Sequence, residues 1–169
     1  KIVCSEPSVV MCLRDELRHF VSGEDAGLVS ENTFELMSYL LGLYQQGKLR
    51  PIEKKSEDSF IYHCPCHLLA AGGCGATIEL LKNLAGIAVA DLKAGCCGLA
   101  GTFGMQQKNY DLSMEISKNL VQALAVSSAK EVLTECSACG MQIEHISGKT
   151  ARHPIEILAE LYAPLAGLL

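Results

Sequence analysis

Residues 94–104, Ala-Gly-Cys-Cys-Gly-Leu-Ala-Gly-Thr-Phe-Gly, place two adjacent cysteines before a glycine at every third position. Adjacent cysteines rarely bond to each other, because the small ring that would form departs from relaxed disulfide geometry. Thiolates at Cys96 and Cys97 are better explained as ligands of one metal centre. Glycine permits positive φ and close approach of the backbone, so Gly98, Gly101 and Gly104 indicate a loop that wraps around such a centre.

The composition excludes several classes of protein. At 169 residues, 49% hydrophobic and 20% charged, the chain is typical of a soluble globular domain. A net charge of −5 argues against a nucleic-acid partner. No apolar run approaches the roughly 20 residues that span a bilayer. The sequence shows no signal peptide and begins at Lys1, so we expect an excised piece of a longer protein.

Nine cysteines are the unusual feature of the composition. Their odd number, the missing secretion signal and the adjacent pair favour metal ligation in a reducing compartment over a disulfide scaffold. We expect Cys4, Cys12 and Cys74 to be incidental thiols.

From residue 59 onward, apolar runs of strand length alternate with helical patterns. Strands are predicted at 60–63, 87–92 and 131–134, and helices at 76–84, 109–126, about 140–146 and 154–162. This alternation predicts an α/β fold, with a small parallel sheet flanked by helices in a Rossmann-like arrangement. A cysteine group follows each strand: 64/66, 96/97 and 136/139. Because ligands gather at the carboxyl ends of parallel strands, the three groups should converge.

The first 50 residues resemble part of a second copy of this unit. A strand is expected at 2–4, a helix capped by Ser8 over 8–20, a polar loop at 22–27 and a helix at 31–46. Residues 2–11 align weakly with 132–141, and residues 34–37 with 155–158. We therefore expect three parts: the end of a degenerate first repeat (1–50), a linker (51–58) and a complete cysteine-rich domain (59–169).

The spacing of five cysteines predicts the chemistry of the site. Thiolate ligands select zinc or an iron–sulfur cluster, and five exceed what tetrahedral zinc needs. Cys64 is a rival to Cys66 for one ligand position. Two alternatives stay open: a structural zinc site in an interaction module, and thiol–disulfide chemistry by Cys136 and Cys139 at a helix start. The five expected ligands are Cys66, Cys96, Cys97, Cys136 and Cys139.

Four motifs carry a resemblance to a known family: Tyr62-His63-x-Pro65-Cys66-His67-Leu68, Gly95-Cys96-Cys97-Gly98-x-Ala100-Gly101-x-Phe103-Gly104, Thr134-x-Cys136-x-x-Cys139 and His153-Pro154-Ile155-Glu156. The sequence resembles the cysteine-rich CCG domain. This domain occurs in the B subunit of heterodisulfide reductase, the C subunit of anaerobic glycerol-3-phosphate dehydrogenase, the iron–sulfur subunit of glycolate oxidase and the C-terminal region of FAD-linked oxidases.

The resemblance implies a [4Fe–4S] cluster of the non-cubane kind on these five cysteines, with zinc as the alternative metal. Gly98, Gly101 and His67 would contact the cluster, and His63 would donate a hydrogen bond to sulfur. Because Val9 stands where the first repeat usually has a cysteine, no second cluster is expected.

The resemblance also implies the setting of the module, which would not be catalytic alone. It would relay electrons between a flavin-dependent dehydrogenase of hydroxy acids or glycerol phosphate and a quinone or disulfide acceptor. FAD would lie on another domain or subunit, and a ferredoxin-type cluster domain would be a further partner. The location would be cytoplasmic, with at most peripheral association at the inner face of the membrane.

Overall fold

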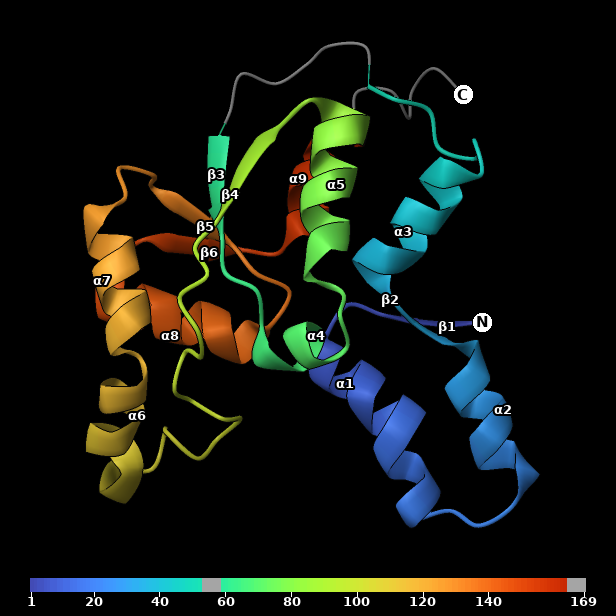
Figure 1. Ribbon diagram of the computed structural model, residues 1–169, viewed down its shortest axis with the longest axis horizontal. Coiled ribbons are helices and arrows are strands. Elements are labelled where there is room, and N and C mark those ends of the chain that lie inside the picture. Colours follow the sequence, from blue (N-terminus) through green and yellow to red (C-terminus); the bar gives the residue numbers. More distant parts are fainter. Residues whose placement is uncertain (53–58, 164–169) are drawn as a thin grey trace.

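The computed structural model describes residues 1–52 and 59–163, which form two parallel sheets flanked by helices (Figure 1). The predicted α/β class, with small parallel sheets between helices, is confirmed. The linker expected at 51–58 falls almost entirely on residues 53–58, outside the described residues.

The larger sheet has four parallel strands in the order β4-β3-β5-β6. Their bounds are Ser59–Tyr62 (β3), Ala88–Asp91 (β4), Glu131–Leu133 (β5) and Thr150–Arg152 (β6). Three of these are the strands expected from apolar runs, whereas β6 was missed because it has only three residues and little apolar character. The chain leaves β3 toward one edge and then returns to build the other edge. The order therefore reverses between β3 and β5, and ligands in such sheets bind at the carboxyl ends beside this reversal.

Helices cover both faces of the larger sheet and bury a hydrophobic cluster on each. Helices α3, α5 and α9 supply one cluster, which includes Tyr62 and Leu133, and α7 and α8 supply the other, which includes Ile61 and Val132. The bounds are Leu36–Gln45 (α3), Cys74–Ala85 (α5), Lys118–Val126 (α7), Ser137–Ser147 (α8) and Pro154–Tyr162 (α9). Adjacent strand residues point to opposite faces, so the two clusters alternate along β3 and β5.

Two predicted helices differ from those observed around the site. The helix expected over 109–126 is divided at Ser117 into α6 (Tyr110–Ile116) and α7. The Ser117 hydroxyl donates to the carbonyl of Met114 at 2.9 Å, a side-chain bond that disturbs the regular helical ladder. A further short helix, α4 (Cys66–Ala70), lies in a segment for which no element was predicted.

The N-terminal part pairs β1 (Ile2–Cys4) with β2 (Thr33–Glu35) in a second parallel sheet. Helix α1 (Pro7–Met11) starts at a proline, which needs no hydrogen-bond partner for its nitrogen, so the predicted Ser8 cap is wrong. The chain continues from α1 through a π-helical turn and a 3₁₀ turn, Cys12–Glu16 and Leu17–His19.

The region between β1 and α3 also departs from prediction. The loop expected at 22–27 largely belongs to α2 (Glu24–Asn32), whose two acidic residues in the first turn suit the helix dipole. The helix expected from residue 31 begins only at Leu36, after β2. There the carboxylate of Glu35 caps α3 by accepting the amides of Met37 and Ser38, at 2.8 and 2.7 Å.

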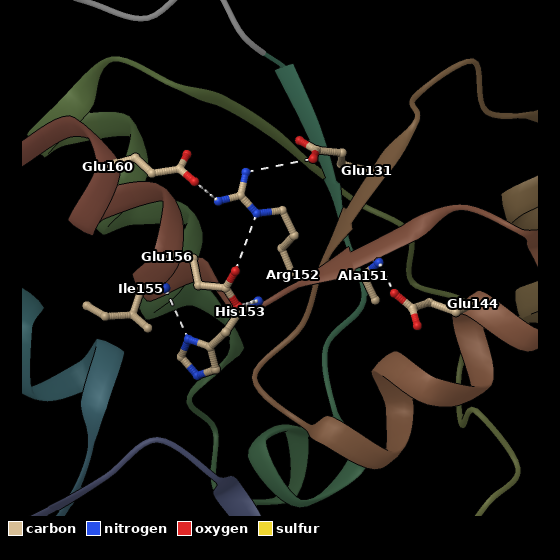
Figure 2. A network of polar contacts seen from close by, with 8 residues as sticks. All are labelled: Glu131, Glu144, Ala151, Arg152, His153, Ile155, Glu156 and Glu160. Atoms are coloured by element: carbon tan, nitrogen blue, oxygen red, sulfur yellow. Dashed lines mark hydrogen bonds and ion pairs between the residues drawn. The ribbon is translucent and has the colours of Figure 1, made fainter.

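Polar contacts at the end of β6 join the last helix to the sheet, as Figure 2 shows, and a hydrogen bond from His153 joins it to the N-terminal part. Arg152 forms ion pairs with Glu131, Glu156 and Glu160. His153 caps α9 as its Nδ1 accepts the Ile155 amide at 3.0 Å, and its Nε2 therefore donates to the Ser5 carbonyl, also at 3.0 Å. Within the described residues, no helix combines the length and apolarity needed to cross a membrane.

Candidate metal centre

The cysteine groups that follow β4 and β5 meet at the carboxyl ends of these strands. Cys96 and Cys97 lie in the loop after β4, Cys136 is the N-cap of α8, and Cys139 lies in the first turn of that helix. Cys66 begins α4, the helix that follows β3. The order of the strands thus brings together residues that are far apart in the sequence, as predicted from the spacing.

Four of the sulfur atoms form a row. The Cys139 thiol donates to Cys97 Sγ at 3.3 Å. Cys97 also interacts with Cys96, and Cys139 with Cys136, so the row runs Cys96–Cys97–Cys139–Cys136. Cys97 and Cys139 are buried, at 3% exposure each, whereas the two outer thiols are half-buried.

Hydrogen bonding among the four thiols shifts their pKa values in opposite directions. Hydrogen bonds from Cys139 and Cys96 lower the pKa of Cys97, and a hydrogen bond from Cys139 lowers the pKa of Cys136. Hydrogen bonding to Cys97 raises the pKa of Cys96, and hydrogen bonding to Cys136 and Cys97 raises that of Cys139. Four sulfur atoms this close together form a soft donor set.

Backbone amides support the outer sulfurs. The Gly98 amide lies 3.3 Å from Cys96 Sγ, and the Cys139 amide lies 3.4 Å from Cys136 Sγ. A positive φ of 90° at Gly98 turns the chain after the cysteine pair. Hydrogen bonds from amides stabilise negative charge on sulfur, as the helix N-terminus does at Cys136.

The remaining expected site residues, Cys66, His67 and Gly101, lie outside the row of four thiols. Cys66 is exposed at the start of α4. His67 lines a cavity of about 300 Å³ between α4 and the N-terminal helices, together with Arg14 and Tyr39. Gly101 occupies an exposed turn with a φ of 66° and no neighbouring atom within 4 Å of a Cβ placed there.

The two faces of the sheet separate Cys64 from the row of thiols. Ile61 packs in the cluster that contains Cys97 and Cys139, whereas Tyr62 packs in the opposite cluster. Alternation gives His63 the face of Ile61 and Cys64 the face of Tyr62. Cys64 forms a disulfide with Cys74 there. The expectations that Cys64 rivals Cys66 as a ligand and that Cys74 is an incidental thiol are therefore wrong.

Two buried polar atoms test whether the site suits a bound group. In the described part of the chain, His63 Nε2 and Thr134 Oγ1 are buried without a hydrogen-bond partner. His63 lies at the end of β3 and its amide donates to the Leu133 carbonyl at 2.9 Å, so both residues lie where β3 and β5 end. A buried donor without a partner is costly and usually marks a group that it contacts. Two such atoms beside a row of thiols fit a sulfur-ligated centre.

Burial keeps His63 neutral, since it lowers the pKa of the imidazole, while the charges of Cys97 and Asp91 oppose this effect. A neutral imidazole carries one N–H, which suits donation to sulfur. The role expected for His63 from the sequence remains compatible with this placement.

A carboxylate network lies on the face opposite the thiols. Glu135 is buried at 1% exposure, accepts the Tyr62 hydroxyl at 3.0 and 2.8 Å, and is also hydrogen-bonded by Thr77. Burial raises the pKa of Glu135 to about 7, although both hydroxyl donors oppose the shift. Sequence reasoning missed this network, because its three members lie on different elements. The position of Glu135 between an apolar strand and a cysteine pair was its only sequence signal.

One residue of the N-terminal part reaches the centre. Glu6 Oε2 accepts the amide of Ser137, the first residue of α8, at 3.1 Å. The weak repeat in the sequence aligns Glu6 with Cys136 itself. The N-terminal part thus contributes a carboxylate beside Cys136 where the cysteine-rich part supplies a thiol.

The fold and the site define a class: an α/β domain that collects cysteine thiols at the carboxyl end of a parallel sheet. Within residues 1–52 and 59–163, no group of three or more His, Cys, Asp or Glu side chains is placed so that it could hold a metal ion. The model of the cysteine-rich CCG domain matches residues 60–144. The chain belongs to this family, which confirms the resemblance predicted from its motifs.

Curated relatives agree with this assignment. The chain is 32% identical over 163 residues to the C subunit of anaerobic glycerol-3-phosphate dehydrogenase of Escherichia coli K12, covering 96% of this chain and 40% of that one. It is 27% identical over 159 residues to D-2-hydroxyglutarate dehydrogenase of the same strain, covering 92% and 15%. It is 25% identical over 128 residues to the glycolate oxidase iron-sulfur subunit of that strain, covering 75% and 31%. The chain thus spans less than half of each relative, and no solved structure matches it.

Proposed function

We propose that this chain is an iron–sulfur electron-transfer module within a larger oxidoreductase. The observation that carries the proposal is the row of four thiols beside two buried polar atoms without partners. Relatives named as an iron-sulfur subunit and as dehydrogenases support a redox role. When bound, an iron–sulfur cluster supplies reversible one-electron transfer.

The five cysteines expected as ligands have distinct places in this proposal. Cys97 and Cys139 would form the buried side of the centre, and Cys96 and Cys136 its half-buried ends. Cys66 would complete the set from the start of α4. A [4Fe–4S] cluster can use all five thiolates, whereas tetrahedral zinc uses four.

Other residues would set the electronic properties of the centre. The Gly98 amide already donates to Cys96, and His63 and Thr134 have free polar atoms at the strand ends. Hydrogen bonds to sulfur stabilise the reduced form and raise the reduction potential. His67 and Gly101 lie further toward the surface, where they would contact the cluster or a partner bound against it.

The division into repeats is part of the proposal. The order of the N-terminal part, β1–α1–α2–β2–α3, resembles β5–α8–β6–α9 apart from the additional helix α2 and the helical turns before it, and both strand pairs are parallel. This similarity supports residues 1–50 as the end of a first repeat and 59–169 as a complete domain. Glu6 and Val9 then replace two ligands, so the chain would hold one centre.

The larger assembly would place a flavoprotein dehydrogenase, with its FAD, and a ferredoxin-type cluster domain next to this module. Electrons from a hydroxy acid or glycerol phosphate would pass through the centre to a quinone or disulfide acceptor. The assembly would be cytoplasmic, with peripheral contact to the inner face of the membrane through its partners.

Anaerobic reconstitution of the chain with iron and sulfide tests the proposal. We expect about four irons and four sulfides per chain, together with an electron paramagnetic resonance signal on reduction. Cys97→Ser should abolish iron uptake, whereas Cys12→Ser, an exposed cysteine far from the row, should not. Binding of one zinc without iron uptake would instead establish the structural-zinc alternative.

The same variants address dithiol chemistry, which the low pKa of Cys136 at a helix start favours as a second candidate. Reductase activity toward a small disulfide that requires Cys136 and Cys139 but survives Cys97→Ser, without iron uptake, would favour this candidate over electron transfer by a cluster.

A further inference from the structure

The disulfide between Cys64 and Cys74 lies outside the proposed centre, and the proposed function does not use it. Its Cα atoms are 5.6 Å apart and its cysteines are separated by 10 residues. Both side chains are half-buried against the hydrophobic cluster that contains Tyr62. This cluster lies on the other face of the sheet from Cys97 and Cys139. The pair is therefore separated from the row of thiols by the sheet itself.

The local sequence brings the two cysteines together. Helix α4 ends at a glycine pair, where Gly72 adopts a φ of 73°. The amides of Gly72 and Gly73 donate to the carbonyls of Leu69 and Leu68, each at 3.0 Å. This turn reverses the chain, so that Cys74, the first residue of α5, lies next to Cys64. The separation of the Cα atoms lies within the range of relaxed disulfides.

We propose that Cys64 and Cys74 form a redox-active dithiol site that reacts with low-molecular-weight disulfides and, when oxidised, restrains α4 and Cys66. One protein thiolate attacks the small disulfide and releases the first small thiol, leaving a mixed disulfide. The second cysteine attacks that mixed disulfide and releases the second small thiol. The protein thus gives up two electrons and two protons and gains one S–S bond, and the small disulfide becomes two thiols.

The ring closed by this bond contains the whole of α4. A helix of five residues has little stability of its own, so its position depends on what anchors its ends. The disulfide anchors the chain on both sides of α4: at Cys64, two residues before Cys66, and at Cys74, after the turn that ends the helix. Restraint of Cys66 matters for the centre only if Cys66 is a ligand, and that consequence rests on the proposed function; the dithiol chemistry does not.

The test uses the metal-free wild-type chain in anaerobic buffers of reduced and oxidised glutathione, quenched by alkylation and analysed by peptide mass mapping. We expect a Cys64–Cys74 linked peptide that rises with the fraction of oxidised glutathione. In Cys74→Ser, Cys64 should instead carry a mixed disulfide with glutathione. Cys12→Ser should leave the linked peptide unchanged, because Cys12 is exposed on another element.

Two results would overturn the proposal. One is alkylation of both Cys64 and Cys74 at every glutathione ratio in a chain whose circular dichroism shows it folded. The other is a link from Cys64 to Cys66 in place of Cys74. Hydrogen exchange of residues 66–70 gives a second measurement: oxidation should slow it in the wild type but not in Cys74→Ser, and equal rates would refute restraint of α4. None of these readouts involves iron, so failure here is distinguishable from failure of the iron–sulfur proposal.

Discussion

Substitution of Gly98 by alanine should destabilise the chain for two reasons: the backbone conformation at this position and the lack of space for a side chain. Gly98 is buried after the cysteine pair and has a φ of 90°, in the region that favours glycine. A Cβ placed on it would overlap the backbone carbonyl oxygen of Ser113 in α6. A backbone atom cannot move aside as the end of a flexible side chain can, so the loop or the helix must shift.

The size of the effect follows from these two terms. An alanine in the left-handed region costs about 1–2 kcal/mol. Overpacking against a buried neighbour adds about 1–3 kcal/mol, which gives about 2–5 kcal/mol in all. Gly101 provides a matched control in the same loop, because its φ is 66° but a Cβ there would meet nothing within 4 Å. Gly101→Ala should therefore show only the first term, about 1–2 kcal/mol.

Urea unfolding of the metal-free chain, followed by far-ultraviolet circular dichroism, measures the difference. At a slope of about 2 kcal/mol per molar urea, Gly98→Ala should unfold about 0.5–1.5 M earlier than Gly101→Ala. Gly104→Ala completes the set, because its Cβ would crowd the Ser113 side chain while its φ is ordinary. Equal midpoints for Gly98→Ala and Gly101→Ala would refute the close packing of this loop on α6.

Three further substitutions test other parts of the structure. Tyr62→Phe should lower the free energy of unfolding by about 1–3 kcal/mol, because buried Glu135 loses a donor to both oxygens; unchanged urea stability would contradict the network. His63→Leu should stabilise the metal-free chain by about 1–3 kcal/mol, because it removes an unpartnered buried atom. The same variant should lower the reduction potential of the reconstituted centre in voltammetry, and an unchanged potential would exclude His63 as a donor. Arg152→Met should destabilise by about 1–2 kcal/mol in low salt and by less in high salt, since the partners in Figure 2 are largely exposed; a salt-independent effect would indicate packing instead.

Much of the cysteine-rich part could be predicted because its signals are local. Strands β3, β4 and β5 are apolar runs of strand length, and the helix beginning at Pro154 carries its own start signal. Parallel topology then brings the residues after these strands to one edge of the sheet, which is why the meeting of the cysteines after β4 with those after β5 could be predicted from the sequence.

The missed elements depend on contacts that the sequence does not display. Strand β6 has three residues and exists through its pairing with β5, and α4 has five and exists between a strand and a glycine turn. In the N-terminal part, the pairing of β2 with β1 overrides the helical pattern, and Glu35 then fixes where α3 begins. In each case, contacts with other parts of the chain decide the secondary structure of a segment whose own sequence favours neither helix nor strand strongly.

The face of the sheet on which a cysteine lies could not be predicted from its spacing in the sequence. Side chains alternate between the two faces of a sheet, so the face on which a cysteine lies depends on which residues of the preceding strand point to that face. In β3 this alternation puts Cys64 on the face of Tyr62 rather than on that of Ile61. Glu135 was missed for a related reason: its partners Tyr62 and Thr77 lie 73 and 58 residues away in the sequence.

The alternation of side chains along β3 and β5 explains how the ends of these strands present different groups to the two faces of the sheet. At the end of β3, His63 lies on the face of the thiols, and Cys64 forms its disulfide on the other face. At the end of β5, Thr134 carries a buried hydroxyl without a partner, and Glu135 belongs to the carboxylate network on the other face. A sheet has a side-chain period of two, so a register slip of one residue would exchange the faces of all four. The buried hydrophobic clusters on both faces prevent such a slip, because Tyr62 and Leu133 would have to exchange places with Ile61 and Val132. The apolar residues of β3 and β5 therefore do more than stabilise the fold: they determine which polar side chains can reach the thiols.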